Sequence, residues 1–220
     1  MAERPVAPSH ALLASLLGDL QLTGNLSHDV PAFLHQHTHP STALHCQQVA
    51  AMARRVAASS SVSLAQAESA GWLHDVSAIF PANERAHIAR TLGLEVLAEE
   101  ERCPMIVHQK LSRLMAQEIF GITDVLILNA VGCHTTLRPW PTVLDKVLFV
   151  ADKLAWDQPG TPPYADALQA ALERSLDQAT CYFLTYLWER RDSLFVIHPW
   201  LRAAVRDLCV GAEEQTQASS

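Results

Sequence analysis

Six side chains of the kind that hold transition metals occur along the chain, in the order His45, His74, Asp75, His108, His134 and Asp152. His74 and Asp75 are adjacent and stand at the end of an apolar helical run. Neighbouring residues on a helix are about 100° apart, so both side chains can turn toward one point on the axis of a helix bundle. A His-Asp pair by itself is usually a surface dipeptide. The other four residues give it weight, because each of them ends or interrupts an apolar helical stripe.

This donor set fits metal ions better than ordinary core packing. Each residue alone has a plainer explanation: His45 as a hydrogen-bonded core histidine, for example, or Asp152 as the partner of a nearby lysine. Six such groups turned inward together would all need partners, and metal ions satisfy them at once. Imidazole nitrogen combined with carboxylate oxygen suits Fe, Mn, Zn, Co or Ni better than Mg or Ca.

The number of donors indicates two ions, because one catalytic zinc usually takes about three protein ligands. Asp75 is the natural bridge between them. Two divalent ions roughly 3.5–4 Å apart would share a hydroxide whose pKa lies near neutrality. With four neutral histidines and two carboxylates the site would carry a charge of about +2, which attracts phosphate oxygens. The expected reaction is metal-assisted hydrolysis of a phosphoester or phosphoanhydride.

Apolar spacing predicts an all-α protein whose helices turn these residues inward. On the helix expected from Ser41, His45, Val49 and Met52 fall on one face. The expected helices span about 9–20, 41–60, 63–79, 84–92, 105–120, 122–134, 142–156, 165–190 and 199–209. The expected organisation is an N-terminal helical extension (1–40), one helical domain with C-terminal helices (41–210) and a flexible tail (211–220).

Two polar segments are interpreted as surface features. His35, His37 and His39 could clasp a metal, but Pro40 follows them, so a polar loop before the next helix is the favoured interpretation. Residues 94–103 contain three consecutive glutamates and are interpreted as a solvated face or loop.

Composition excludes several classes of function. The net charge of −7 argues against a broad nucleic-acid surface, although a bound metal would still allow a small phosphorylated substrate. No run of 18 apolar residues is present, so no membrane span is expected, and the N-terminus lacks the apolar core of a secretory signal. Five scattered cysteines without Cys-x-x-Cys spacing fit reduced thiols in a cytoplasm. Cys133 is interpreted as a small buried thiol, with a metal ligand as the alternative.

The residues around the donor set resemble those of the HD-domain phosphohydrolases. That family has the same order of His, His-Asp, His, His and Asp. Four stretches resemble, more narrowly, the YqeK-type bacterial enzymes: Ala70–Asp75, Phe120–Asp124, Ala130–Thr136 and Asp145–Lys153. The resemblance covers roughly residues 41–157. It implies an HD-domain helical bundle and the symmetrical hydrolysis of diadenosine tetraphosphate into ADP at a di-iron centre.

The same resemblance implies roles for individual residues. The ligands expected for one metal are His45, His74, Asp75 and Asp152, and those expected for the other are Asp75, His108 and His134. His74, Asp75, His108 and His134 would form the catalytic centre. Iron is the expected metal, with Mn, Co, Ni or Zn as alternatives. The expected partner is a small nucleotide substrate, with no nucleic acid and no membrane, and a homodimer is one expectation for the assembly.

The chain departs from that family at three positions, of which the first two are phosphate contacts by the resemblance. Ala78 stands where a lysine is usual, Gln158 stands where an arginine is usual, and Gln109 replaces the glycine after the histidine. The candidates to supply the missing positive charge are Lys110, Arg138 and Lys153. The alternative for each is a solvated surface cation. Two other functions therefore stay open: hydrolysis of another nucleotide or phosphoester, and a non-catalytic nucleotide- or metal-binding sensor. A plain helical protein without metal is the third alternative.

Overall fold

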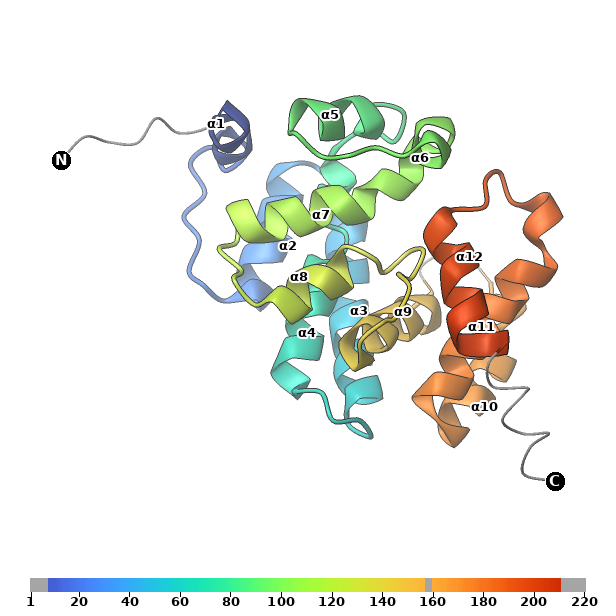
Figure 1. The fold of residues 1–220 in the computed structure, drawn as a ribbon. Helices are drawn as coiled ribbons and strands as arrows, with labels where there is room; N and C mark the ends of the chain where they lie inside the picture. Colours follow the sequence, from blue (N-terminus) through green and yellow to red (C-terminus); the bar gives the residue numbers. More distant parts are fainter. Residues whose placement is uncertain (1–7, 157–159, 211–220) are drawn as a thin grey trace, which may run out of the picture.

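The computed structural model describes residues 8–156 and 160–210, and every regular element in these ranges is helical, which confirms the all-α class (Figure 1). The α-helices are α1 (Pro8–Ser15), α2 (Leu26–Gln36), α3 (Pro40–Ala57), α4 (Leu64–Leu73), α5 (Arg85–Thr91), α6 (Ala98–Arg102), α7 (His108–Glu118), α8 (Val125–Val131), α9 (Val143–Leu154), α10 (Ala165–Arg174), α11 (Leu176–Glu189) and α12 (Pro199–Val205). Short 3-10 turns occur at Val76–Ile79, Pro104–Val107 and Arg191–Ser193, and a π-helical turn at Arg206–Val210. Gln158 and the expected tail at 211–220 lie outside the described residues. No helix in the described ranges is long and apolar enough to cross a bilayer.

Helices α3 and α4 lie side by side at the centre of the bundle and approach each other very closely (Figure 1). Gly71 of α4 permits this approach, because a Cβ atom there would lie 2.4 Å from Ala50 Cα and 2.6 Å from Ala50 N. Protein interiors are close-packed, so no larger residue fits without moving a backbone. The close approach brings His45 on α3 opposite His74, which directly follows α4.

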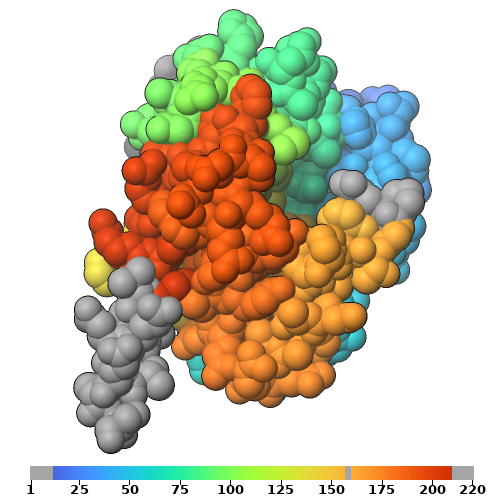
Figure 2. All heavy atoms as spheres, turned by 90° about the vertical axis from the view of Figure 1, so that its right-hand side faces the viewer, coloured from blue at the N-terminus to red at the C-terminus, as the bar shows by residue number. Residues whose placement is uncertain are grey.

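Helix α9 is buried on both sides because it lies between two apolar clusters. Leu148 and Ala151 belong to the main core of the bundle, whereas Phe149 and Val150 belong to a second cluster with α10, α11 and α12. The Phe149 ring meets Phe183 of α11 edge-on, with the ring centroids 5.6 Å apart. The C-terminal helices gather on one side of the bundle (Figure 1), where they form a continuous orange-to-red surface (Figure 2).

A buried polar cluster joins α12 to the bundle. Glu100 of α6 is fully buried, so the predicted solvated face at residues 94–103 is wrong at this position. Its Oε2 accepts a hydrogen bond from Lys110 Nζ at 2.7 Å, and its Oε1 lies 3.2 Å from His198 Nε2. Because His198 Nδ1 accepts from Trp200 N at 3.1 Å, Nε2 carries the ring proton and donates to the carboxylate. One carboxylate thus connects α6, α7 and the start of α12.

Replacing Glu100 with Gln is expected to lower the free energy of unfolding by about 1–3 kcal/mol at neutral pH, because Lys110 loses its charged partner. Burial opposes ionisation of Glu100, but the hydrogen bond from His198 and other donors hold its pKa below the ordinary 4.5. Such a carboxyl stabilises the fold above its unfolded pKa and loses that contribution as the pH falls through the folded pKa. Urea unfolding should therefore show a difference from the parent at neutral pH that shrinks below pH 4.5. A difference that does not vary with pH would contradict this assignment.

The predicted polar loop at His35–Pro40 is wrong in extent. Helix α2 continues through His35, and His37 ends it with its Nε2 2.8 Å from the carbonyl of Leu16. Pro40 opens α3, where its missing N–H is harmless because the first turn of a helix has no internal acceptor. None of the three histidines belongs to a cluster of potential metal ligands in the described part of the chain.

The single helix expected over 165–190 is instead two helices, because Ser175 interrupts it. Ser175 is extended, with φ −169° and ψ 158°, and its hydroxyl accepts a hydrogen bond from Gln178 N at 3.1 Å. Serine is a favoured N-cap for this reason. The interruption lets α10 and α11 fold against each other and against α9.

Candidate metal centre

The six residues singled out from the sequence converge on one place in the bundle, although they come from separate segments. His45 lies on α3, His74 and Asp75 follow α4, His108 begins α7, His134 follows α8 and Asp152 lies on α9. The Nε2 atoms of His45 and His74 are 3.2 Å apart, and those of His108 and His134 are 2.9 Å apart. The rings of His74 and His134 meet edge-on at 5.0 Å between centroids, which joins the two pairs.

The two carboxylates lie between the imidazoles in an arrangement suited to two ions. Asp75 directs Oδ2 toward His74 Nε2 at 3.6 Å and Oδ1 toward His108 Nε2 at 3.3 Å. Asp152 Oδ1 lies 3.3 Å from His45 Nε2 and 3.5 Å from His74 Nε2. The two oxygens of Asp75 therefore face different imidazoles, Oδ2 toward His74 and Oδ1 toward His108 and His134, as those of a bridging carboxylate would.

Backbone carbonyls fix the orientation of three of the histidines. In His74, His108 and His134, Nδ1 lies 2.8, 2.6 and 2.8 Å from the carbonyl oxygen three residues earlier. A carbonyl can only accept, so Nδ1 carries the proton and the lone pair of Nε2 points to the centre. Metal-binding histidines typically hold their second nitrogen in this way.

The spacing of these nitrogens provides a test of whether metal ions fit. The facing Nε2 atoms of His108 and His134 are both acceptors, so they cannot bond to each other across 2.9 Å. Two ligand atoms that bind one metal at about 2.1 Å and at right angles lie about 3 Å apart, which matches this separation. A cation between the lone pairs removes an otherwise unfavourable buried contact. The residues present therefore fit metal ions.

The charges of the centre favour ionised carboxylates beside metal-binding imidazoles. Burial opposes ionisation of Asp75, yet the surrounding imidazoles, that of His74 first, hold its pKa well below the ordinary value. Burial lowers the pKa of His134 well below its ordinary value, so this ring is neutral at pH 7. Despite burial, the charge of Asp75 and the hydrogen bond with Asp152 raise the pKa of His74, so protons and metal ions compete for its Nε2.

The centre is deepest at two histidines and opens toward solvent beside Asp75. The side chains of His74 and His134 are 0% and 1% exposed, whereas that of Asp75 is 25% exposed. His108 is 14% exposed, and its Nε2 lies 3.3 Å from Asp75 Oδ1. Asp75 is therefore the most exposed of the six side chains, followed by Asp152 at 15% and His108.

The three cations proposed from the sequence to bind substrate occupy different places. Lys153 contacts the carboxylate of Asp152, so it lies directly beside the metal-ligand cluster. Lys110 and Arg138 each donate to a fully buried carboxylate, at 2.7 Å in both cases. Both also line a separate cavity of about 340 Å³, whose lining includes none of the six clustered residues. Lys153 is thus the one of the three that the structure places at the centre.

Two polar residues of the centre did not emerge from the sequence as site residues. The hydroxyl of Thr135 lies 3.1 Å from His108 Nε2. Gln109 is fully buried, accepts from Thr135 N at 3.1 Å through Oε1 and donates to Thr136 Oγ1 at 3.1 Å through Nε2. Gln109 thereby fastens the start of α7 to the turn that carries His134. Its position directly after His108 was the available signal.

Replacing Gln109 with Ala is expected to weaken metal binding and activity by roughly ten- to a hundredfold, because the amide that positions two ligand segments is lost. Buried backbone donors of the turn also lose their acceptor, so the melting temperature should fall. Metal titration followed by calorimetry checks the first effect. Gln117 on the same helix is exposed and provides the matched control, since Gln117→Ala should change neither quantity. Unchanged metal affinity in Gln109→Ala would remove the positioning role.

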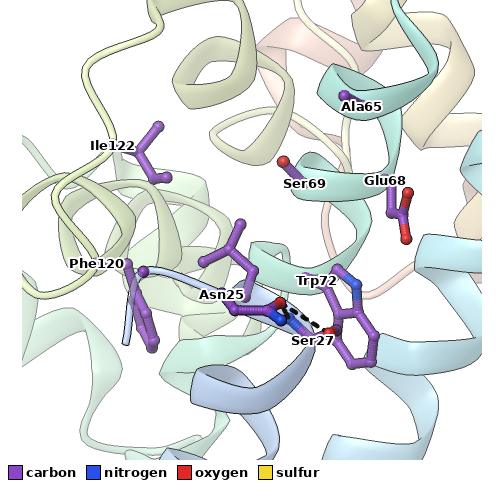
Figure 3. Close-up of a pocket in the computed structure, with 10 residues that line it drawn as sticks. Asn25, Ser27, Ala65, Glu68, Ser69, Trp72, Phe120 and Ile122 are labelled. Atoms are coloured by element: carbon purple, nitrogen blue, oxygen red, sulfur yellow. Dashed lines mark hydrogen bonds between the residues drawn. The ribbon is translucent and has the colours of Figure 1, made fainter. Parts of the chain in front are cut away.

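A second, larger pocket of about 500 Å³ lies away from the centre. Its walls come from the start of α2, from α4 and from the segment that follows α7 (Figure 3). Trp72 and Phe120 stand on opposite sides, with Asn25 and its hydrogen-bonded partner Ser27 between them (Figure 3). The amide of Asn25 caps α2, so its contact is explained by the fold.

Comparison with known proteins gives one family over the part of the chain that carries the centre. The HD domain family matches residues 42–157. A Lactococcus lactis subsp. cremoris relative, named an uncharacterized protein in the pepC 5' region, is 42% identical over 147 residues, or 67% of this chain and 74% of the relative. A Bacillus subtilis protein named bis(5'-nucleosyl)-tetraphosphatase, symmetrical, is 26% identical over 132 residues, which are 59% of this chain and 70% of that protein.

A solved structure from Clostridium acetobutylicum has the same fold. It is described as a predicted HD superfamily hydrolase involved in NAD metabolism, with a TM-score of 0.75 and 23% identity over 83% of this chain and 96% of that chain. The range of the family match, 42–157, includes all six converging residues. This chain belongs to the HD-domain family.

Proposed function

We propose that this protein is a dinuclear-metal phosphohydrolase that cleaves the phosphoanhydride chain of a nucleotide, with symmetrical diadenosine tetraphosphate as the leading substrate and ADP as the product. One observation carries the proposal: four imidazoles direct Nε2 atoms at two carboxylates, and the two oxygens of Asp75 face His74 at 3.6 Å and His108 at 3.3 Å. The curated relatives named symmetrical bis(5'-nucleosyl)-tetraphosphatases support the choice of substrate.

The residues that would hold the metals follow from the distances in the cluster. His45, His74 and Asp152 lie close enough together to hold one ion. The second close group is His74, Asp75 and His134, and His108 joins it at 3.3 Å from Asp75 Oδ1 and 2.9 Å from His134 Nε2. We assign Asp75 as the ligand shared by the two ions. Divalent ions bound there supply Lewis acidity, which lowers the pKa of water and neutralises charge on phosphate oxygens. Iron is the proposed metal, with Mn, Co, Ni or Zn as alternatives.

The protein's own groups hold this arrangement ready for substrate. The three carbonyl contacts to Nδ1 keep the imidazoles pointing inward, so little reorganisation is needed when charge develops. The open edge beside Asp75 admits the phosphate chain, while the buried rings of His74 and His134 exclude water from behind. Lys153 compensates the charge of Asp152 through its second oxygen.

The test is hydrolysis by protein loaded separately with Fe²⁺, Mn²⁺, Co²⁺, Ni²⁺ or Zn²⁺. Diadenosine tetraphosphate should yield ADP as the sole nucleotide product, because cleavage is symmetrical. ATP and AMP together would indicate asymmetric cleavage and a different substrate position. If neither this compound nor a panel of nucleotides and phosphoesters released product with any metal, the enzymatic proposal would fail.

A sensor that binds nucleotide without turnover is the second candidate. The observation in its favour is that Lys110 and Arg138 are engaged with buried carboxylates, so they are not available to a substrate. Calorimetry with ADP on the metal-loaded protein separates the two candidates, since tight binding without any hydrolysis would support the sensor. The expected homodimer stays a prediction, and light scattering of the purified protein tests it.

A further inference from the structure

Arg85, the first residue of α5, is held at the open edge of the metal centre by two backbone carbonyls. Its Nε donates to the carbonyl of Phe80 at 3.1 Å, and its Nη1 contacts the carbonyl of Met105 at 3.5 Å. Phe80 ends the 3-10 turn that follows Asp75, and Met105 lies in the turn that precedes His108. The guanidinium therefore bridges the two segments that carry Asp75 and His108.

The carbonyl of Met105 places Arg85 next to His108, which is one of the candidate metal ligands. Met105 O also accepts from His108 Nδ1 at 2.6 Å, so the guanidinium and the imidazole share one oxygen atom. The electrostatics agree with this proximity: burial lowers the pKa of Arg85, and the negative charge of Asp75 acts against that shift. The pKa of His108 is lowered by burial first, and the positive charge of Arg85 lowers it further.

Arg85 also keeps donors and charge that the fold does not use. A guanidinium has five N–H donors, and the two carbonyls accept hydrogen bonds from only some of them. Within residues 8–156 and 160–210 no carboxylate forms an ion pair with Arg85, in contrast to the pairs of Lys110, Arg138 and Lys153. A half-buried arginine without a counter-ion is costly unless a ligand supplies the negative charge.

We propose that Arg85 is a phosphate-binding residue, which holds the phosphate chain of a nucleotide polyphosphate at the edge of the centre formed by Asp75 and His108. The inference rests on the proposed function and adds to it the group that replaces the positive charge missing at Ala78. Arginine suits this role because its planar fork binds phosphate oxygens through paired hydrogen bonds. The two carbonyl contacts orient the fork before substrate arrives.

The test compares Arg85→Gln and Arg85→Lys with Arg90→Gln. Arg90 lies on the same helix, is exposed and pairs with Glu101, so it is the matched control. Binding of inorganic pyrophosphate and ADP to the metal-loaded proteins is measured by calorimetry, together with metal content. Arg85→Gln should weaken both ligands roughly ten- to a hundredfold at unchanged metal content. Arg85→Lys should recover part of the loss, because it keeps the charge but not the fork, and Arg90→Gln should bind like the parent.

Two outcomes would overturn the inference. Parent-like pyrophosphate binding in Arg85→Gln at full metal content would show that Arg85 does not contact phosphate. Loss of metal in both Arg85 variants would show that the side chain supports His108 instead. The binding assay needs no turnover, so it tests Arg85 separately from the proposed function. A parent protein that binds these ligands but hydrolyses no substrate would refute the proposed function. The comparison of the variants would still decide whether Arg85 binds phosphate. Arg85→Lys serves alone if the Gln variant fails to fold.

Discussion

Replacing Asp75 with Ala is expected to remove both metals and to lower kcat for diadenosine tetraphosphate by about a thousandfold or more. Its Oδ2 faces His74 and its Oδ1 faces His108, whereas the second oxygen of the other carboxylate, Asp152, contacts Lys153, so Asp75 is the carboxylate placed to bind two ions. Elemental analysis of the purified variant, followed by hydrolysis assays with added metal, measures the two effects. Metal content equal to that of the parent would refute the bridging role.

The His45→Ala variant is the comparison for Asp75→Ala, because it removes a ligand of one ion and not the bridging ligand. The Nε2 atom of His45 lies 3.2 Å from His74 and 3.3 Å from Asp152, so the residue belongs to one group of donors only. We therefore expect this variant to lose mainly one metal. If His45→Ala and Asp75→Ala lost the same amount of metal, the two ions would bind as one cooperative unit. The assignment of His45 to one ion only would then be refuted.

Replacing Gly71 with Ala is expected to cause the largest loss of stability, about 3 kcal/mol, because overpacking in a core forces backbone shifts. The added Cβ would meet backbone atoms of α3, 2.4 Å from Ala50 Cα and 2.9 Å from Val49 C, and neither can rotate away. The two helices must separate, which also moves His74 away from His45. Denaturant unfolding and metal content should both change.

Gly132→Ala is the matched control for Gly71→Ala. A Cβ at Gly132 would also be crowded, at 2.7 Å, but the nearest atom is Cδ of the Arg113 side chain, and the nearest backbone atom, Leu128 O, is 3.3 Å away. A long side chain can turn aside, so the expected loss is smaller, about 1 kcal/mol or less. An equal loss in the free energy of unfolding in the two variants would show that Gly71 is not needed for the close spacing of α3 and α4.

The set of metal ligands was predictable because the residue types histidine and aspartate by themselves indicate side chains that can bind metal ions. Where a histidine begins an apolar stripe, as His45 does, the inward direction follows from helical spacing alone. The interpretation of Cys133 as a small buried thiol agrees with the structure. The side chain is buried, and burial raises the pKa of its thiol far above the ordinary value. Helical class likewise follows from the 3.6-residue spacing of apolar residues.

The pairing of charged residues was not predictable, because it depends on which segments meet in space. Glu100 stands among consecutive glutamates and suggests a solvated surface, yet the fold brings His198 and Lys110 to it. Arg85 lies ten residues after Asp75, and only the intervening turn returns it to the centre. Helix α2 was missed because Gly24 and Asn25 suggest a break, while the structure uses Asn25 as a cap.

The position of α9 between two clusters has a consequence for biosynthesis. Asp152 lies on α9, and Phe149 of the same helix is covered by Phe183 and other residues of α11. While the ribosome is still translating residues 165–189, the side of α9 that packs on α11 has no partner, and the helix is held only by its contacts with α3, α4 and α8. We expect the nascent chain to acquire its metals only after the C-terminal helices have emerged, which makes cofactor insertion one of the last events in maturation.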